Sequence, residues 1–236
     1  MSNGWDESAE AWIAEIGEAG DWARQHVLDP ALLERIARRG YRHALDVGCG
    51  EGRMCRVLQA RAIQTVGIDP TAALLERARA LDPCGDYQSA RAEALPFAEA
   101  EFDLVLSCLT LVDIADFRQA FREMVRVLEP GGTLLIANLT SFTSTSAKGS
   151  VRDADGRFLY FPVDRYLDEF PMWVAWKRIR IQNWHRPLSA YMSELLHHGL
   201  KLVYFDEPPP RTGEAEAIAN YRRAPWFLVM EWQKPG

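Results

Sequence analysis

The sequence predicts an α/β fold: a doubly wound, mostly parallel sheet of seven strands with an antiparallel terminal hairpin strand. Two observations lead to this prediction. Strand-like apolar runs alternate with helical patterns five times between residues 44 and 139, as in a chain built from repeated strand, helix, strand units. Later, the strand-like residues 201–205 and 226–232 follow one another without an amphipathic helix between them, which favours a hairpin and an antiparallel edge strand.

Length and composition limit the class of protein. A chain of 236 residues with 48% hydrophobic content suits one domain with an elaboration. A formal net charge of -6 argues against nucleic acid as the main partner. The four cysteines form no Cys-x-x-Cys pair and lack histidines at metal-ligand spacing, so we expect a reduced, cytoplasmic protein without a metal site. No secretion leader or membrane-spanning apolar run is present, so no membrane association is expected.

Residues 1–40 are expected to form an N-terminal helical lid, and residues 41–236 the main domain. Apolar residues recur at helical spacing in two groups of the lid, which Gly17 and Gly20 separate. Asp21 is a plausible N-cap for the second group, and Pro30 should interrupt it, so the helix that leads into the first strand is predicted to begin near residue 29. The three tryptophans of this region could help to cover a ligand.

The first strand, residues 44–47, runs into a glycine-rich turn. Glycines at 48, 50 and 52 let the backbone pass close to a ligand without Cβ clashes. The helix predicted at residues 53–61 would begin under this turn, so its first N–H groups would face that ligand. Glycine at every second position is found in nucleotide-binding turns of the NAD type as well, so the turn alone does not identify the ligand.

The second strand, residues 65–68, ends at Asp69-Pro70. Asp69 lies 21 positions after Gly48, where a carboxylate can accept hydrogen bonds from both hydroxyls of a ribose. This favours a ribose-bearing cofactor without distinguishing its kind. An aspartate before proline could instead only cap the next helix, predicted at residues 71–81.

The remaining units of the sheet follow in order. A short third strand is predicted at residues 87–90, a buried fourth strand at 101–107, an amphipathic helix at 116–128 and a fifth strand at 133–139.

Three segments together resemble the class I S-adenosylmethionine (SAM) dependent methyltransferases. Residues 45–53, LDVGCGEGR, resemble the first motif of that family. Ala-Glu-x-Leu-Pro-Phe at 92–97, followed closely by Phe-Asp-Leu-Val, resembles its adenine-binding loop and fourth strand, and Leu-x-Pro-Gly-Gly-x-Leu-Leu at 128–135 is a third matching stretch. This combination is not a feature of NAD folds. The resemblance implies a Rossmann-like methyltransferase fold, SAM as cofactor and S-adenosylhomocysteine as product.

The resemblance also implies a set of cofactor-binding residues. Arg91 departs from the family, which usually carries an aspartate there to accept from the adenine amino group; an arginine cannot accept. Either the Ala92 and Glu93 backbone with the Glu93 carboxylate holds the adenine, or apolar contact does. The full set comprises Asp46 for the turn and the cofactor amino group, Gly48, Cys49 and Gly50 for the methionyl and ribose parts, Asp69 and Pro70 for the ribose, Ala92 and Glu93 for the adenine, and Ser107, Cys108 and Leu109 for the sulfonium.

Residues 140–187 are predicted to be a cap insertion, because they far exceed the usual length of a connection. Within it, residues 157–161 and 173–184 look like the two strands of a small hairpin. The three cap tryptophans could hold a planar substrate or form a small satellite core.

His185 is the first candidate for a general base, since an imidazole with a pKa near ~6.5 suits proton removal from a methyl acceptor. A packing role is the alternative. Asp113, Tyr160 and Tyr191 are weaker candidates.

The predicted function is SAM-dependent methyl transfer to an O, N or C nucleophile of a small molecule, with an aromatic acceptor suggested by the tryptophans. The alternatives are a SAM-binding regulator without catalysis and a nucleic-acid methyltransferase. The basic residues of the cap suggest the latter, whereas residues 107–110 lack the Asn/Asp-Pro-Pro-Tyr run of adenine methylases. The sequence indicates no oligomeric state.

Overall fold

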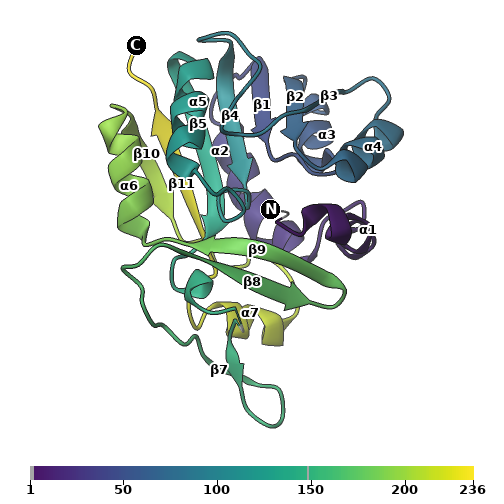
Figure 1. Ribbon diagram of the computed structural model, residues 1–236, viewed down its shortest axis with the longest axis vertical. Helices are drawn as coiled ribbons and strands as arrows, with labels where there is room; N and C mark the ends of the chain where they lie inside the picture. The colour runs from purple at the N-terminus through teal and green to yellow at the C-terminus, as the bar shows by residue number, and fades with distance from the viewer. Residues whose placement is uncertain (1–2, 148) are drawn as a thin grey trace.

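A seven-stranded sheet forms the centre of the molecule (Figure 1). The computed structural model describes residues 3–147 and 149–236, so two residues of the expected lid and one of the expected cap insertion lie outside the described residues. The strands of the sheet are β1 (His43–Val47), β2 (Gln64–Asp69), β3 (Asp86–Ser89), β4 (Phe102–Cys108), β5 (Leu128–Leu139), β10 (Lys201–Asp206) and β11 (Phe227–Gln233).

The order of these strands confirms the predicted fold class. It is β10-β11-β5-β4-β1-β2-β3. The strands β1 to β5 are parallel to one another, and β11 is antiparallel to both β5 and β10. The chain starts at β1, moves outward through β2 and β3, and returns to β4 on the other side of β1. Ligands of doubly wound sheets bind beyond the carboxyl ends of the strands at this reversal.

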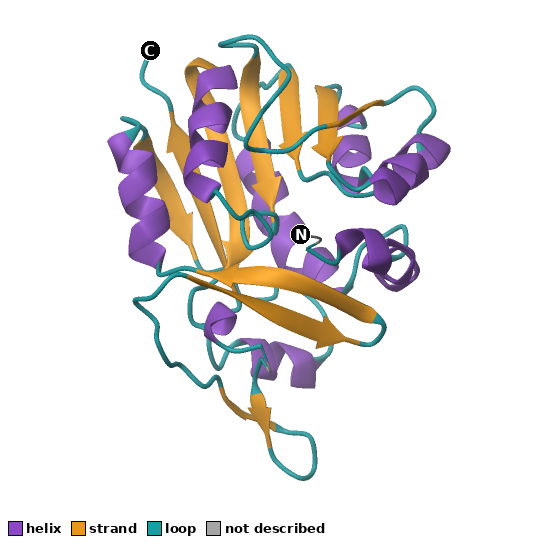
Figure 2. Cartoon of the chain, viewed as in Figure 1, coloured by secondary structure: helices purple, strands orange, loops and turns teal. Residues whose placement is uncertain are grey.

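Helices cover both faces of the sheet (Figure 2). On one face α5 (Phe117–Val127) and α6 (Leu188–His197) pack against residues such as Val105 and Ile136. On the other face α2 (Asp29–Ile36) and α3 (Arg53–Gln59) pack against Leu104 and Leu106. Consecutive residues of β4 therefore serve opposite cores, which explains why this strand is apolar throughout. The helix α4 (Ala72–Leu81) follows β2 as predicted.

The Pro-Gly-Gly segment lies within β5 and interrupts its pairing with β4 without ending the strand. Phe102 pairs with Leu128 and Leu104 pairs with Thr133, so residues 129–132 bulge out between two paired positions. The strand thus begins earlier than predicted. The preceding helix is capped by Asp116, whose carboxylate accepts from the Gln119 N–H at 3.0 Å.

The N-terminal residues form two helical segments, as expected. The helix α1 (Trp5–Ile16) ends before Gly17 and Gly20, which both have positive φ, and the Asp21 carboxylate accepts from the Arg24 N–H at 2.8 Å. The helix that leads into β1 begins at Asp29, as predicted, but Pro30 does not separate it from the helical residues before it. A π-helical turn, η1 (Arg24–Leu28), runs directly into α2, where Pro30 occupies the first turn and its missing N–H costs no helical hydrogen bond.

The cap insertion contains two hairpins rather than the single predicted one. The strand β6 (Val151–Arg152) pairs with β7 (Phe158–Tyr160), and β8 (Phe170–Trp176) pairs with β9 (Ile179–His185). The prediction of one strand over residues 173–184 is wrong because the chain reverses at Lys177, a residue with φ 49°. Hairpin turns of this kind usually show Asn-Gly or a similar pair, and Lys-Arg gives no such signal.

The final hairpin has a long tip between β10 and β11. It contains α7 (Ala215–Tyr221), which has no buried residue, so much of the tip is surface as predicted. Tyr221 nevertheless packs on Trp22 and Trp226, with ring centroids 4.8 and 5.0 Å apart. Among the described residues, every helix is too short or too polar to cross a membrane.

Candidate active site

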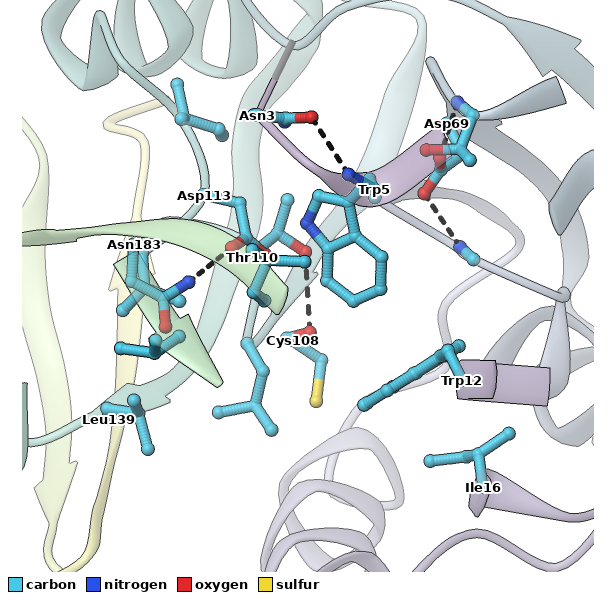
Figure 3. A pocket seen from close by; sticks show the side chains of 18 of the residues that line it. Asn3, Trp5, Trp12, Ile16, Asp69, Cys108, Thr110, Asp113, Leu139 and Asn183 are labelled. Carbon is cyan, nitrogen blue, oxygen red and sulfur yellow. Dashed lines mark hydrogen bonds between the residues drawn. The ribbon is translucent and has the colours of Figure 1, made fainter. Parts of the chain in front are cut away.

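A cavity of about 670 Å³ lies beyond the carboxyl ends of β1, β2 and β4, where the strand order reverses. Ligand sites of small molecules typically have this size. The wall of the cavity is formed by the glycine turn, the end of β2, α1, the segment after β4 and the β8–β9 hairpin. Figure 3 shows side chains from these elements pointing toward a common space.

The three glycines of the turn have different roles. All have positive φ, at 77°, 56° and 76° for Gly48, Gly50 and Gly52. A Cβ on Gly48 would lie 2.3 Å from the Thr110 side chain, and one on Gly52 would lie 2.5 Å from the Tyr87 ring. A Cβ on Gly50 would meet no atom within 4 Å, and Gly50 lines the cavity. Gly48 and Gly52 are therefore required by packing, whereas Gly50 keeps an open backbone beside the cavity.

Asp69 supports the glycine turn and also lies at the cavity wall. Its carboxylate accepts from the Gly50 N–H at 3.0 Å and from the Thr71 N–H at 2.8 Å. The second contact is a turn that leads into α4, whose N-cap residue, Thr71, forms no side-chain capping hydrogen bond. Two carboxylate oxygens offer about four acceptor sites, so capacity remains for ligand hydroxyls. Burial raises the pKa of Asp69. Pro70 lines the cavity beside it.

Asp46 and Cys49 lie behind the turn, against a smaller cavity of about 70 Å³ that Gly48 and Gly50 also line. The Cys55 thiol donates to the Asp46 carboxylate at 3.5 Å. Asp46 is only 2% exposed, and its burial raises its pKa to about 7. This residue is therefore placed to support the strand end rather than to line the large cavity.

The segment expected to hold an adenine, residues 92–97, begins at the cavity with Ala92 and Glu93. Arg91, which departs from the family pattern, forms an ion pair with Glu93 at 2.8 Å. The arginine thus engages one Glu93 oxygen and leaves the other available.

The end of β4 divides into a lining part and a buried part. Cys108 and Leu109 line the cavity, and burial raises the pKa of the Cys108 thiol to about 11, so it stays protonated at neutral pH. Ser107 is fully buried between β1 and β5, and its hydroxyl has no hydrogen-bond partner among the described residues. The structure therefore does not bring the Ser107 side chain to the cavity.

Aromatic rings form much of the remaining wall. Trp12 packs edge-on against Trp5 and Trp176, with centroids 5.3 and 6.5 Å apart. Of the three cap tryptophans only Trp176 lines the cavity, and Trp226 lines it from the terminal hairpin. In the described part of the chain no group of His, Cys, Asp and Glu side chains is arranged to hold a metal ion.

Known proteins share both the sequence and the fold of this region. Residues 45–136 match the family model of the methyltransferase domain. A SAM-dependent methyltransferase from Mesorhizobium loti has the same fold, with a TM-score of 0.77 and 28% identity, covering 92% of this chain and all of that one (100%). Residues 45–136 therefore belong to the methyltransferase-domain family, and the chain has the fold of a SAM-dependent methyltransferase.

Curated relatives of this chain include two O-methyltransferases. A malonyl-[acyl-carrier protein] O-methyltransferase from Enterobacter lignolyticus is 34% identical over 137 residues, covering 56% of this chain and 55% of that enzyme. The O-methyltransferase resE from Aspergillus sclerotiorum is 37% identical over 112 residues, covering 44% of this chain and 42% of that enzyme. The chain thus spans about half the length of the curated relatives it matches.

His185, the first predicted base of this methyltransferase, lies away from the cavity. Its Nε2–H donates to the Tyr166 carbonyl at 3.0 Å, so its Nδ1 accepts from the Ser144 hydroxyl at 2.9 Å. The side chain is fully buried, and this burial lowers its pKa. Both ring nitrogens are therefore occupied in a neutral imidazole that faces the cap interior.

Asp113, a weaker candidate from the sequence, lies in the cavity wall of the methyltransferase (Figure 3). The Asn183 amide donates to its Oδ1 at 2.6 Å. Burial raises the pKa of Asp113 to about 8, although the neighbouring Trp5 indole acts to lower it. Its position after β4 was visible in the sequence, but its two partners come from residues 108 positions before it and 70 positions after it.

Proposed function

We propose that this chain transfers a methyl group from SAM to a nucleophile of a small molecule. The observation that carries the proposal is one continuous cavity with two unlike ends. Gly50, Asp69 and Glu93 from the family motifs line one end, and Asp113, with Asn183 and Trp5 beside it, lines the other. A regulator that only binds SAM would not require the second, aromatic end.

The described residues fit SAM at the first end. Gly50 would allow the cofactor to approach the backbone, Asp69 would accept from the ribose hydroxyls, and Ala92 with Glu93 would contact the adenine. Cys108 and Leu109 would face the sulfonium, while Asp46, Cys49 and Ser107 would support these groups from behind. When bound, SAM supplies a methyl group that is already strongly electrophilic.

The protein's own contribution would be alignment, exclusion of water and proton removal. Asp113 is the described carboxylate at the acceptor end of the cavity, and we propose it as proton acceptor in place of His185. A pKa of about 8 in the ligand-free protein is close to the operating pH, which suits a general base. A cationic ligand beside it would lower that pKa and favour its ionised form.

The malonyl-[acyl-carrier protein] O-methyltransferase is one guide to the acceptor, but this chain covers only 55% of that enzyme. A nucleic-acid substrate is not favoured, because five acidic side chains and only two arginines line the cavity among the described residues. These acidic residues are Glu15, Asp21, Asp69, Glu93 and Asp113.

The proposal is tested by ligand binding to the whole chain. A ligand at about 100 times its Kd stabilises a protein by about 2.7 kcal/mol, which should raise the Tm of a chain of this size by roughly 5–10 °C. We expect this shift with SAM and with S-adenosylhomocysteine, and none with NAD. Calorimetry without heat for either SAM or S-adenosylhomocysteine would contradict the proposal.

Two glycine variants locate the binding site within the same test. Gly50→Ala and Gly131→Ala both place alanine at positive φ, 56° and 77°, and neither new Cβ meets an atom within 4 Å. Each should cost about 1 kcal/mol of stability through backbone strain. Only Gly50→Ala should weaken SAM binding, by about tenfold or more. Equal SAM affinity of the two variants would remove the glycine turn from the proposed site.

A further inference from the structure

The acceptor end of the cavity is built around one carboxyl group. Asp113 follows β4, Trp5 belongs to α1 and Asn183 belongs to β9; Asn183 donates a hydrogen bond to Asp113, and the Trp5 indole lies beside it as a second donor group. Figure 3 shows these three side chains pointing toward one another, with Thr110 beside them. Two donors leave part of the acceptor capacity of the carboxylate unused.

The charges that line the cavity as a whole are unbalanced. Each lining arginine already has an acidic partner: Arg24 pairs with Asp21 at 2.6 Å, and Arg91 pairs with Glu93 at 2.8 Å. Glu15 pairs with Lys177 outside the wall. Asp69 and Asp113 remain as lining acids without an ion pair among the described residues.

We infer that this acceptor end selects a flat aromatic compound that carries an uncharged hydroxyl or amino group, and that it rejects carboxylates. The inference rests on the proposed function and specifies its acceptor. A hydroxyl or amine can donate to Asp113 while its ring lies against Trp5, Trp12 or Trp176. A carboxylate would lose its hydration next to an acidic group. Among the described lining residues, no cationic side chain is unpaired and able to form an ion pair with it.

The group transfer balances with these residues alone. The acceptor oxygen or nitrogen forms a bond to the methyl carbon as the bond from carbon to sulfur breaks, and the bonding pair stays on sulfur. The acceptor loses its proton to the Asp113 carboxylate, which later releases it to water. The sulfonium becomes a neutral thioether. A carboxylate acceptor would need no proton acceptor, so Asp113 would serve no purpose for it.

The test measures binding of three matched probes to the complex of the chain with S-adenosylhomocysteine. The probes are naphthol, naphthylamine and naphthoate, substituted at the same ring position, and calorimetry gives each Kd at about pH 9, where Asp113 with its pKa of about 8 is mostly ionised. We expect naphthol and naphthylamine to bind at least about tenfold more tightly than naphthoate. Equal or tighter binding of naphthoate overturns the inference, and so does absence of binding by all three.

Binding of S-adenosylhomocysteine in the same samples separates the two proposals. If it fails to bind, the proposed function is wrong; if it binds and naphthoate is preferred, only the acceptor inference is wrong. Asp113→Asn, which keeps the size of the side chain, should reduce the discrimination against naphthoate by about tenfold.

A pair of tryptophan variants tests the hydrogen bond itself. Trp5→Phe removes the indole donor to Asp113 and keeps an aromatic ring. Trp12→Phe is the matched control on the same helix, since Trp12 contacts the Trp5 and Trp176 rings. Only Trp5→Phe should raise the pKa of Asp113, seen as a shift to higher pH in naphthol binding, because a donor to the ionised form is lost. Equal shifts in both variants would overturn this part of the inference.

Discussion

At the scale of single residues, burial shifts the pKa values of the two candidate bases in opposite directions. It lowers the pKa of His185 and raises that of Asp113 to about 8, because burial disfavours the charged form of either group. The imidazole is closed off by Ser144 and Tyr166, whereas the carboxyl faces a cavity large enough for ligands. Proximity to the cavity, rather than the ordinary pKa of the residue type, makes Asp113 the stronger candidate.

The buried state of Asp113 predicts how stability depends on pH. Its pKa is about 8 in the folded protein and near the ordinary 3.8 when unfolded, so between these values the folded chain binds a proton that the unfolded chain has released. The free energy of unfolding should therefore fall as pH rises, by up to about 1.4 kcal/mol per pH unit, and the loss should level off above the folded pKa.

Asp113→Asn should remove this contribution. Urea denaturation from about pH 5 to about pH 9 should show a steeper decline for the natural chain than for the variant. Asp46, with its pKa raised to about 7, contributes a decline of the same sign to both proteins, so the difference between them is the relevant quantity. Parallel curves would show that Asp113 is not protonated in the folded state.

Residues near the glycine turn could be placed from the sequence because their geometry is local. Gly50 lies in the turn after β1, and Asp69 ends the neighbouring parallel strand, so both had to reach one edge of the sheet. Ser107 lies near the end of a strand, but strand alternation puts its side chain on the same face as Val105, where it is fully buried. The Trp5 and Asn183 contacts join segments far apart in sequence, for which the sequence carries no local signal.

At the scale of elements, β9 holds the segment that carries Asp113. The Trp184 N–H donates to the Val112 carbonyl at 2.6 Å. Arg186, just after β9 and 1% exposed, donates to the carbonyls of Leu111, Ile114 and Ala115 at 2.9, 2.6 and 2.9 Å. A planar guanidinium with five donors suits three diverging carbonyls. Residues 184 and 186 therefore hold the backbone on both sides of Asp113, the proposed base.

Replacement of Arg186 tests this support. Arg186→Met should lower the free energy of unfolding by about 3 kcal/mol, because three carbonyl groups lose a buried donor. The control is Arg180→Met on β9, where the exposed guanidinium lies over the Trp173 ring at 4.2 Å and should matter by about 0.5–1 kcal/mol.

Urea denaturation gives both energies, and the pH dependence of stability reports on Asp113. Arg186→Met should also change the part of that pH dependence that Asp113→Asn removes, since the segment holding the carboxyl is loosened. If Arg186→Met behaves like Arg180→Met in both measurements, the proposed support of Asp113 by the cap is wrong.

The elements that the sequence predicted well are those with a long, regular pattern. The five parallel strands, the three helices between them and the terminal hairpin have apolar periodicity over whole strands and helices, and tertiary packing did not override it. The β8–β9 reversal is different, because a lysine at positive φ makes the turn and its side chain pairs with Glu15 of α1. A contact between distant elements thus stabilises a turn that local preference does not indicate.

At the scale of the whole molecule, segments far apart in sequence close the cavity together. The Gln182 N–H donates to the Asn3 carbonyl at 2.8 Å, and the Ser8 hydroxyl bonds to the Arg180 backbone at 3.1 Å, so α1 is attached to β9. On the other side the Trp22 indole donates to Glu214 of the terminal tip at 2.8 Å. The acceptor end exists only when the N-terminal region, the cap and the tip are all in place.

The N-terminal 40 residues nevertheless differ in what they support. The helix α1 contacts β9 and lines the cavity, whereas η1 and α2 contribute Val27, Leu28, Leu32 and Ile36 to the core under the sheet. Fully burying each of these four side chains stabilises the fold by about 1.5–3 kcal/mol, together roughly 6–12 kcal/mol. Domains are stable by only about 5–15 kcal/mol in total. Removal of η1 and α2 should therefore prevent folding, whereas removal of α1 should not.

Two truncations test this division. A chain beginning at residue 21 keeps the Asp21 cap and should fold cooperatively, bind S-adenosylhomocysteine within about tenfold of the full chain, and lose the preference for naphthol over naphthoate, because Trp5 no longer holds Asp113. A chain beginning at residue 41 should not give a cooperative thermal transition. A folded product from residue 41 would show that α2 is dispensable to the core, and retained naphthol preference from residue 21 would show that α1 does not form the acceptor end.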